Sequence, residues 1–497
     1  MRPTLARLLQ LGLALTFFLT LVGWAVSSPV GSSPDDDYHL TSIWCSPLSD
    51  SYPCSEVLNS DGDLTLLVPR VAAEAHACFA FQPDVTADCA RTDIADERLS
   101  DRANQIQQLY PSGFYTVHSI FAGSSFDSSV LAMRLFNALL ATGLLVAFVF
   151  LSAPALRTSA LVAVPVILVP MGFFVIASTN PSGWTLVGCL FFFLFMVNAL
   201  IVRSHRRAYW PSLVLAVLSA LMAIVSRVDG SAFIAIIALV VAVLMFTRRG
   251  EGRRGAWIVL ALSAVTAVVG FLAQGSGPVG SAARIGDSEY VGGLLFDNIL
   301  EVPGFLAGIV GLGPLGWADT RMPGVVSTAG LVTFGAVAFW GLQVMNQRKS
   351  IASVILLVAT LGLPVYVSQQ ERIAVLDFIQ ARYLLPLAAV LLVVLASALP
   401  QLKRDPLGRV PHAVLTTLLA TSSVVALWVN FHRYALGAEE PFFSREMDLA
   451  WAGLLGSASG PLLIVAVLAS IAFFILAQVI YGREQNLEVD SPERSKT

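Results

Sequence analysis

Twelve apolar stretches, each about as long as a helix that spans a bilayer, run through this chain of 497 residues. Lipid offers no hydrogen-bonding partners, so the backbone amides of such a stretch must bond within it, and each stretch is expected to be helical. The sequence therefore predicts an all-α integral membrane protein with about twelve transmembrane helices. The stretches lie near residues 8–26, 129–151, 158–178, 184–202, 210–226, 231–247, 256–274, 327–346, 351–368, 383–400, 411–431 and 460–481.

The composition agrees with a lipid environment. Only 13% of the residues are charged and 56% are hydrophobic, whereas soluble domains contain about 25% charged residues. A formal net charge of -3 without a long basic block gives no reason to expect a nucleic-acid partner. The first stretch follows a short basic start, as in a secretory signal peptide. Its full length and the poor cleavage site at 25–28 favour the alternative, an uncleaved first helix.

Lys and Arg residues gather in the short loops of one side of the predicted bundle, whereas most Asp and Glu residues fall on the other side. The basic side is expected to face the cytoplasm, which places both termini there and two long loops outside. The second loop contains a weakly apolar stretch, broken by Gly and Pro, that is suited to re-entering the membrane. The chain thus divides into helix 1 (1–26), a first outer loop (27–128), helices 2–7 (129–274), a second outer loop (275–326), helices 8–12 (327–481) and a cytoplasmic tail (482–497).

The first outer loop contains four of the five cysteines, while Cys189 lies in an apolar stretch. An even set of cysteines in such a loop predicts disulfides formed in an oxidising compartment. Three connectivities are possible, and we favour the two local pairs because each closes a short loop. A zinc site is the alternative, but the spacings differ from the two-residue spacing that is typical of structural zinc. The favoured pairs are Cys45 with Cys54 and Cys78 with Cys89.

The same loop opens with the sequence Pro-Asp-Asp-Asp-Tyr-His at residues 34–39. Asp35, Asp36 and His39 offer ligands for a divalent cation such as Mg²⁺ or Mn²⁺. Alternatively, Asp35 or Asp36 could act as a general base, with its pKa raised by its like-charged neighbours. A solvated acidic turn is the third interpretation, and this motif alone does not decide among them.

Further polar clusters are expected on the same face, at the ends of predicted helices. Arg227 and Arg382 are informative, because cations are scarce on this face and a guanidinium fork suits a phosphate. Each could instead form an ordinary ion pair, for example Arg227 with Asp229. Trp317 could stack on a sugar, although aromatic residues also gather at membrane interfaces in general. The candidate substrate-binding residues are His39, Asn180, Arg227, Trp317, Asp319, Arg321, Gln380, Arg382 and Tyr383.

The order of these clusters resembles that of an uncharacterised family of bacterial multi-pass membrane proteins related to the GT-C glycosyltransferases. The shared motifs are Pro-Asp-acidic-x-x-His after helix 1, Asn-Pro-x-Gly, Gly-Trp-x-Asp-Thr and Gln-x-Arg-Tyr-x-x-Pro. The likeness covers most of the chain. This sequence departs from it at Asp36, where the family usually has Glu, and at Ala381, where Gly is common.

The resemblance implies a GT-C-like fold and a glycosyltransferase in the bacterial cytoplasmic membrane. Its donor would be a polyprenyl-phosphate sugar, its acceptor a cell-envelope glycan or protein on the outer face, and membrane lipid its surroundings. Such enzymes carry an essential carboxylate beside helix 1, the position of Asp35 and Asp36. A carboxylate there could take the proton of the acceptor hydroxyl, while Arg382 and Arg227, or a metal, stabilise the departing polyprenyl phosphate.

Two other classes of function are compatible with the sequence. One is a transporter or flippase of a lipid-linked envelope precursor, and the other is a non-catalytic scaffold for envelope assembly. Transporters usually carry ionisable residues near the bilayer midplane. The centres of the predicted helices are almost free of such residues, which favours chemistry at the outer surface.

Overall fold

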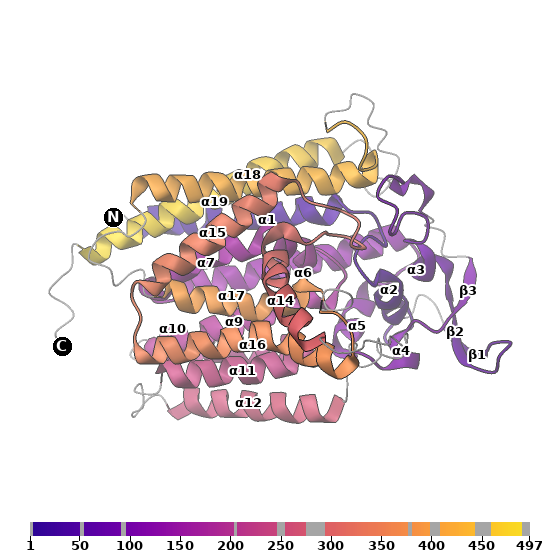
Figure 1. Cartoon of the computed structure of the whole chain (residues 1–497), viewed down its shortest axis with the longest axis horizontal. Coiled ribbons are helices and arrows are strands. Elements are labelled where there is room, and N and C mark those ends of the chain that lie inside the picture. Colours follow the sequence, from indigo (N-terminus) through magenta and orange to yellow (C-terminus); the bar gives the residue numbers. More distant parts are fainter. Residues whose placement is uncertain are drawn as a thin grey trace.

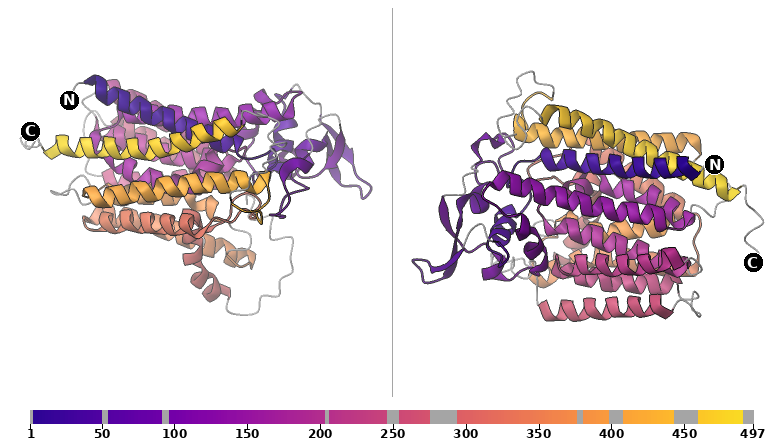
Figure 2. Two further views of the ribbon diagram at one scale, coloured as in Figure 1. Left: turned by 90° about the horizontal axis from the view of Figure 1, so that it is seen from above. Right: turned by 180° about the vertical axis from the view of Figure 1, so that it is seen from behind.

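The long helices lie side by side in one bundle, and a layer of short helices and strands covers one end of it (Figure 1). α1 (Pro3–Val26) begins and α19 (Ser459–Val489) ends at the opposite end of the bundle, as both views of Figure 2 show. We call the layer formed by the described part of residues 27–125 the cap layer. The computed structural model describes residues 3–49, 54–90, 96–202, 206–245, 254–274, 294–375, 380–397, 408–442 and 459–489.

Twelve helices within the described ranges are long and apolar enough to cross a membrane, which confirms the predicted all-α membrane fold. Their apolar side chains face either lipid or one another, because neither environment requires a polar partner. Besides α1 and α19, these spans contain α6 (Phe126–Leu151), α9 (Pro181–Ile201), α10 (Arg206–Ile224), α11 (Val228–Met245), α12 (Arg254–Gln274), α14 (Leu294–Ala307), α15 (Gly324–Leu342), α16 (Gln347–Glu371) and α18 (Arg409–Ala435), and the twelfth runs from Pro154 to Ile176. α17 (Leu385–Ala396) is shorter and is not among the twelve.

The third predicted helix is interrupted. α7 (Pro154–Ile167) is followed by a π-helical turn, η3 (Leu168–Gly172), in which Val169 has an extended backbone, and then by the short α8 (Phe173–Ile176). Pro170 has no backbone N–H to donate within a helix, and its ring clashes with the preceding turn. This is the physical reason for the break. The chain from α7 to α8 is largely buried inside the bundle.

Two helices differ from the sequence expectation. The sequence predicts a loop over 275–326, whereas residues 294–312 form α14 and a π-helical turn, η4 (Gly308–Leu312), and count among the candidate spans. α14 is inclined to its neighbours in Figures 1 and 2. The span predicted over 383–400 is shorter, because a 3-10 turn, η5 (Ala381–Leu384), precedes the twelve residues of α17, all of them buried. The part of the predicted loop over 275–293 lies outside the described residues.

The predicted tail over 482–497 begins as helix. α19 continues to Val489, and Arg157 at the start of α7 donates to the Glu484 carboxylate at 2.5 Å. This ion pair gives one charge of α19, beyond the apolar stretch, a partner on α7. Residues 490–497 lie outside the described part of the chain.

The cap layer is built around α2 (Asp36–Trp44), in which all nine residues are buried. A small antiparallel sheet in the order β1-β2-β3 lies beside it, with Leu66 opposite both Glu56 and Ser100. The remaining elements are β1 (Ser55–Leu58), β2 (Leu64–Pro69), α3 (Arg70–Glu74), η1 (Ala87–Cys89), β3 (Glu97–Ser100), α4 (Asn104–Gln107), α5 (Gly113–His118) and η2 (Ser119–Phe121).

Side chains of α6 and α18 hold the chain where it leaves α1. Arg134 of α6 is buried, and its guanidinium donates to the carbonyl oxygens of Ala25 (2.9 Å), Ser28 (2.6 Å) and Pro29 (2.8 Å). The amide of Asn430 in α18 donates to the hydroxyl of Ser28 at 2.7 Å. The last carbonyls of a helix have no partner within it, so these side chains cap α1 and set the path into the cap layer.

Both favoured disulfides are present. Cys45 at the end of α2 pairs with Cys54, and Cys78 pairs with Cys89, which confirms the predicted connectivity. Cys189 is a buried free thiol in α9. The two bridges close short loops, one between α2 and β1 and one between α3 and β3, and tie α2 and η1 to the rest of the cap layer.

Digestion of the unreduced protein should release one cross-linked peptide that contains Cys45 and Cys54 and another that contains Cys78 and Cys89. Reduction should separate both, as mass spectrometry can show. Cys189 should react with a maleimide only after unfolding, because a buried thiol is shielded from the reagent. A peptide that joins Cys45 to Cys78 would contradict this connectivity.

Candidate functional site

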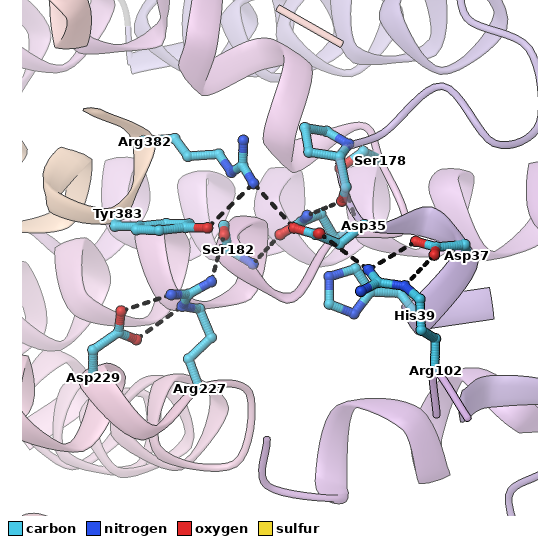
Figure 3. A network of polar contacts seen from close by, with 12 residues as sticks. Asp35, Asp37, His39, Arg102, Ser178, Ser182, Arg227, Asp229, Arg382 and Tyr383 are labelled. Atoms are coloured by element: carbon cyan, nitrogen blue, oxygen red, sulfur yellow. Dashed lines mark hydrogen bonds and ion pairs between the residues drawn. The ribbon is translucent and has the colours of Figure 1, made fainter. Parts of the chain in front are cut away.

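Asp35 stands at the centre of a polar network between the cap layer and the bundle (Figure 3). Its backbone φ of 60° lies in the left-handed region, which a residue other than glycine rarely adopts. Its side chain is 37% exposed to solvent, and its carboxylate oxygens lie 3.4 Å from a nitrogen of Arg382 and 3.5 Å from a nitrogen of Arg102. Asp35 is therefore an accessible carboxylate held between two cations.

The other two carboxylates of the motif are engaged. Asp37 accepts from two nitrogen atoms of Arg102, one of them at 3.2 Å. Asp36 is buried and accepts from the backbone N–H of Ser33 at 3.0 Å and from the hydroxyl of Thr179 at 2.7 Å. The sequence names both Asp35 and Asp36 as candidate bases, but only Asp35 can be reached from solvent.

Burial raises the pKa of Asp36 to about 6, against the opposing effect of the Arg134 charge and of the two donors. The carboxylate thus sits in a low-dielectric environment that disfavours its charged form. Arg134 also anchors the end of α1, so Asp36 and Arg134 together form a charged centre that shapes the chain on either side of Asp35. We interpret Asp36 as a structural group.

Arg227 and Arg382 meet on either side of Tyr383, as Figure 3 shows. Arg227 forms two 2.8 Å contacts with Asp229 and lies over the Tyr383 ring at 4.4 Å. This is the ion pair that the sequence offers as the simpler interpretation of Arg227. Arg382 is different: it is buried, its contacts to Asp35 and to the Tyr383 hydroxyl are 3.4 and 3.5 Å long, and its Nε has no partner in the described structure.

His39 and Asn180 are buried next to Asp35, and each is held by hydrogen bonds. His39 is buried, its Nδ1 lies 3.0 Å from the Tyr115 hydroxyl, and burial lowers its pKa to about 3, so its ring is neutral at physiological pH. Asn180 caps α9 by accepting from the N–H of Ser182 and donates to the carbonyl of Pro34, both at 2.9 Å. Asn180 therefore acts by positioning the backbone next to Asp35.

The remaining candidates lie outside this network. Asp319 is buried and pairs with Arg433 at 3.1 Å, and the Trp317 Nε1 donates to the carbonyl of Gly31 at 2.8 Å. Arg321 and Gln380 are exposed side chains, and no hydrogen bond in the described chain joins either to Asp35. The structure thus gathers Asp35, His39, Arg227, Arg382 and Tyr383.

The three tentative metal ligands do not form a cation site. The Asp36 carboxylate already accepts hydrogen bonds from Thr179 and from a backbone N–H, and His39 is hydrogen-bonded to Tyr115. Asp35 lies between two arginines. Among the residues that the structure describes, no three His, Cys, Asp or Glu side chains are grouped so as to hold a metal ion. The donor set does not fit a resident divalent cation, so we derive no step through one.

Two arginines that the sequence reasoning missed complete the site. Arg102 lies in the last third of the first loop, among many polar residues, and nothing in its local pattern distinguishes it. Arg134 carries a readable signal: it is a lone cation in an apolar stretch, where such residues are expensive and usually have a specific partner. Its partners are backbone carbonyls, which no side-chain motif reveals.

The fold and this site define a multi-pass membrane protein with a polar centre at one end of its helix bundle. The chain belongs to the family described as predicted membrane protein (DUF2142), whose family model matches residues 18–393. The match includes every residue of the network around Asp35 and ends within α17. No curated protein and no solved structure matches the chain. The description of the family names no activity.

The raised pKa of Asp36 generates a prediction about stability. The folded protein holds this proton more tightly than the unfolded chain, so the contribution of Asp36 is present below pH 4 and is lost as the pH rises to 6. A rise from 3.8 to about 6 corresponds to about 3 kcal/mol. The unfolding temperature of Asp36→Asn, relative to the wild type, should therefore increase between pH 4 and pH 6 in a thermal-unfolding series.

Asp61→Asn is the matched control, because Asp61 is an exposed carboxylate in the turn between β1 and β2. Its curve should run parallel to that of the wild type. Parallel curves for Asp36→Asn as well would show that Asp36 has an ordinary pKa in the folded protein.

Proposed function

We propose that this chain is a membrane glycosyltransferase that transfers a sugar from a polyprenyl-phosphate donor to a cell-envelope acceptor on the outer face of the bacterial cytoplasmic membrane. The observation that carries the proposal is the accessible Asp35 carboxylate, set beside the buried guanidinium of Arg382 at the end of the bundle. A carboxylate can act as a general base and a cation can receive an anionic leaving group. The expectation from the motifs, which resemble those of a membrane protein family related to the GT-C enzymes, agrees with the same reaction.

In the proposed reaction the acceptor hydroxyl approaches Asp35, which accepts its proton as the oxygen attacks the anomeric carbon of the donor sugar. The bond between that carbon and the phosphate oxygen breaks, and the polyprenyl phosphate leaves with the electron pair. The products are the glycosylated acceptor and polyprenyl phosphate. Asp35 returns the proton to solvent, which its exposed surface permits.

Arg382 is the residue best suited to the leaving phosphate. Its contact to Asp35 is long, and its buried Nε has no partner within the described residues, so donors of the guanidinium fork remain for a phosphate oxygen. Arg227 has its charge balanced by Asp229 and stacks on Tyr383. We assign Arg227 the role of positioning Tyr383 and thereby Arg382.

Two independent features support the proposed orientation of the chain. Disulfides persist in oxidising compartments, and both lie in the cap layer, so this layer belongs outside. By the sequence, the short loops rich in Arg join the other ends of the helices, and such loops are expected to face the cytoplasm. The site then faces the outer surface, where a lipid-linked sugar and a soluble acceptor can meet.

Asp35→Asn should lower the rate of sugar transfer by a factor of about 10² to 10⁴, because an amide cannot take the acceptor proton. The assay would follow acceptor-dependent loss of labelled polyprenyl-phosphate hexoses by the protein in lipid nanodiscs. Asp61→Asn, which changes an exposed carboxylate far from the network, should transfer at the wild-type rate. An undiminished rate for Asp35→Asn would remove Asp35 from the role of base.

Arg382→Ala should weaken donor binding and slow transfer, and Arg382→Lys should restore little, since lysine keeps the charge but lacks the planar fork. The measurement is the KM for the donor and kcat of each variant. Arg7→Ala removes an exposed arginine of α1 at the other end of the bundle and should leave both constants unchanged. A donor KM and kcat at wild-type values in Arg382→Ala would contradict the assignment.

A peptide tag inserted after Gly62, in the exposed turn between β1 and β2, should be labelled in intact cells by a reagent that does not cross membranes. A tag before α1 should be labelled only after the membrane is permeabilised. The reverse pattern would show that the cap layer faces the cytoplasm.

A further inference from the structure

Three aromatic rings, His76, Phe81 and Trp317, form a group beside the network, which we call the aromatic shelf. The rings of His76 and Trp317 are stacked, with centroids 4.5 Å apart and an interplanar angle of 21°. Phe81 meets Trp317 edge-on at 5.5 Å. Trp317 is nearly buried, whereas Phe81 keeps 69% of its surface exposed. The shelf thus presents the exposed ring of Phe81 beside the buried Trp317 and the half-buried His76.

Phe81 is held in an unfavourable conformation by a heavily bonded loop. Its φ of 61° is in the left-handed region, and its N–H donates to the Asp319 carboxylate at 3.2 Å. The disulfide between Cys78 and Cys89 closes the same loop. Arg433 of α18 donates to three carbonyls of this loop, those of Phe79, Gln82 and Val85.

Strained backbone positions concentrate at the site. Of the five non-glycine residues with positive φ in the described chain, Asp35 lies in the network, Phe81 lies in the shelf, and Ala318 directly follows Trp317 of the shelf. Such strain persists only where the surroundings enforce it, and it gathers at functional sites. The exposure of Phe81 is therefore maintained against both backbone strain and the cost of leaving an apolar ring in water.

The shelf is continuous with the Asp35 network. The carbonyl that holds Trp317 belongs to Gly31, in the segment that leads from α1 to Asp35. Gly31 packs so closely on the shelf that a Cβ there would lie 2.7 Å from the backbone nitrogen of His76. The charges of Asp37, Arg102 and Asp35 all act on the His76 ring. A molecule resting on the shelf would therefore extend toward the carboxylate.

We propose that the aromatic shelf binds a saccharide ring of the acceptor next to Asp35. This inference rests on the proposed transfer reaction and deepens it by naming the acceptor as a glycan. The face of a sugar ring carries C–H groups that pack on an aromatic ring, while its hydroxyl groups need polar partners around the edge. Phe81 supplies the ring, and Asp37 and Arg102 supply polar groups on the side toward Asp35.

The test is the binding of tetrasaccharides of glucose, galactose, mannose and N-acetylglucosamine to the protein in nanodiscs, without donor, by saturation-transfer NMR. At least one should bind to the wild type and to Phe81→Trp, which keeps an aromatic ring. Phe81→Gly should bind about three- to tenfold more weakly. Glycine adopts positive φ without strain, so this variant removes the ring and leaves the loop folded.

Leu58→Ala is the matched control, because Leu58 is 65% exposed on β1 of the same layer, and it should bind as the wild type does. Equal binding by Phe81→Gly, or no binding by the wild type, would overturn the proposal. So would quenching of the added fluorescence of Phe81→Trp by brominated lipids, which would place the ring in the membrane.

The shelf and the transfer reaction can fail separately. Asp35→Asn should bind the tetrasaccharide normally, because its defect lies in proton transfer. Binding without transfer by the wild type would refute the transferase and support the shelf. Transfer with an unchanged acceptor KM in Phe81→Gly would refute the shelf alone.

Discussion

The site depends on the hydrogen bonds that the buried guanidinium of Arg134 donates to the chain where it leaves α1. A charge inside a membrane protein is costly unless it has polar partners. The two terminal nitrogen atoms of Arg134 donate to the carbonyl of Ala25, in the last turn of α1, and to those of Ser28 and Pro29 just after it. Those carbonyls would otherwise lack partners. The same guanidinium offsets part of the cost of burying Asp36. One side chain of α6 thus binds both the end of α1 and the segment that leads from it to Asp35 and α2.

Three consecutive aspartates show how environment divides one chemistry into three roles. Asp36 is buried and accepts hydrogen bonds from Thr179 and from a backbone N–H, whereas Asp37 binds Arg102. Asp35 keeps an accessible surface between two arginines. The helix start is responsible: Asp35 precedes α2 with a left-handed backbone, while the other two belong to its first turn. The two buried or paired residues hold the accessible one in place.

Helix formation in lipid and short loop closure are local effects, so the sequence predicts the helical bundle, the two disulfides and the gathering of Asp35, Arg227 and Arg382 at one end. The contacts that decide each residue's role are distant in the chain. Asp37 meets Arg102 and Asp36 meets Thr179 only because the cap layer folds onto the bundle, so the pattern of residues 34–39 does not reveal which carboxylate is exposed. The Gly and Pro residues within 294–312 predict a loop there, but the segment is apolar enough to form a helix nonetheless.

The tie between Asp319 and Arg433 bears on how this protein can be divided. The family match ends at residue 393, whereas Arg433 and Asn430 both come from α18, beyond it. They hold the Phe81 loop and the hydroxyl of Ser28. A chain shortened to the matched region would leave the Asp319 carboxylate buried without its cation and the exit of α1 clamped from one side only. α18 is thus an integral part of the fold that holds the candidate site rather than a removable extension.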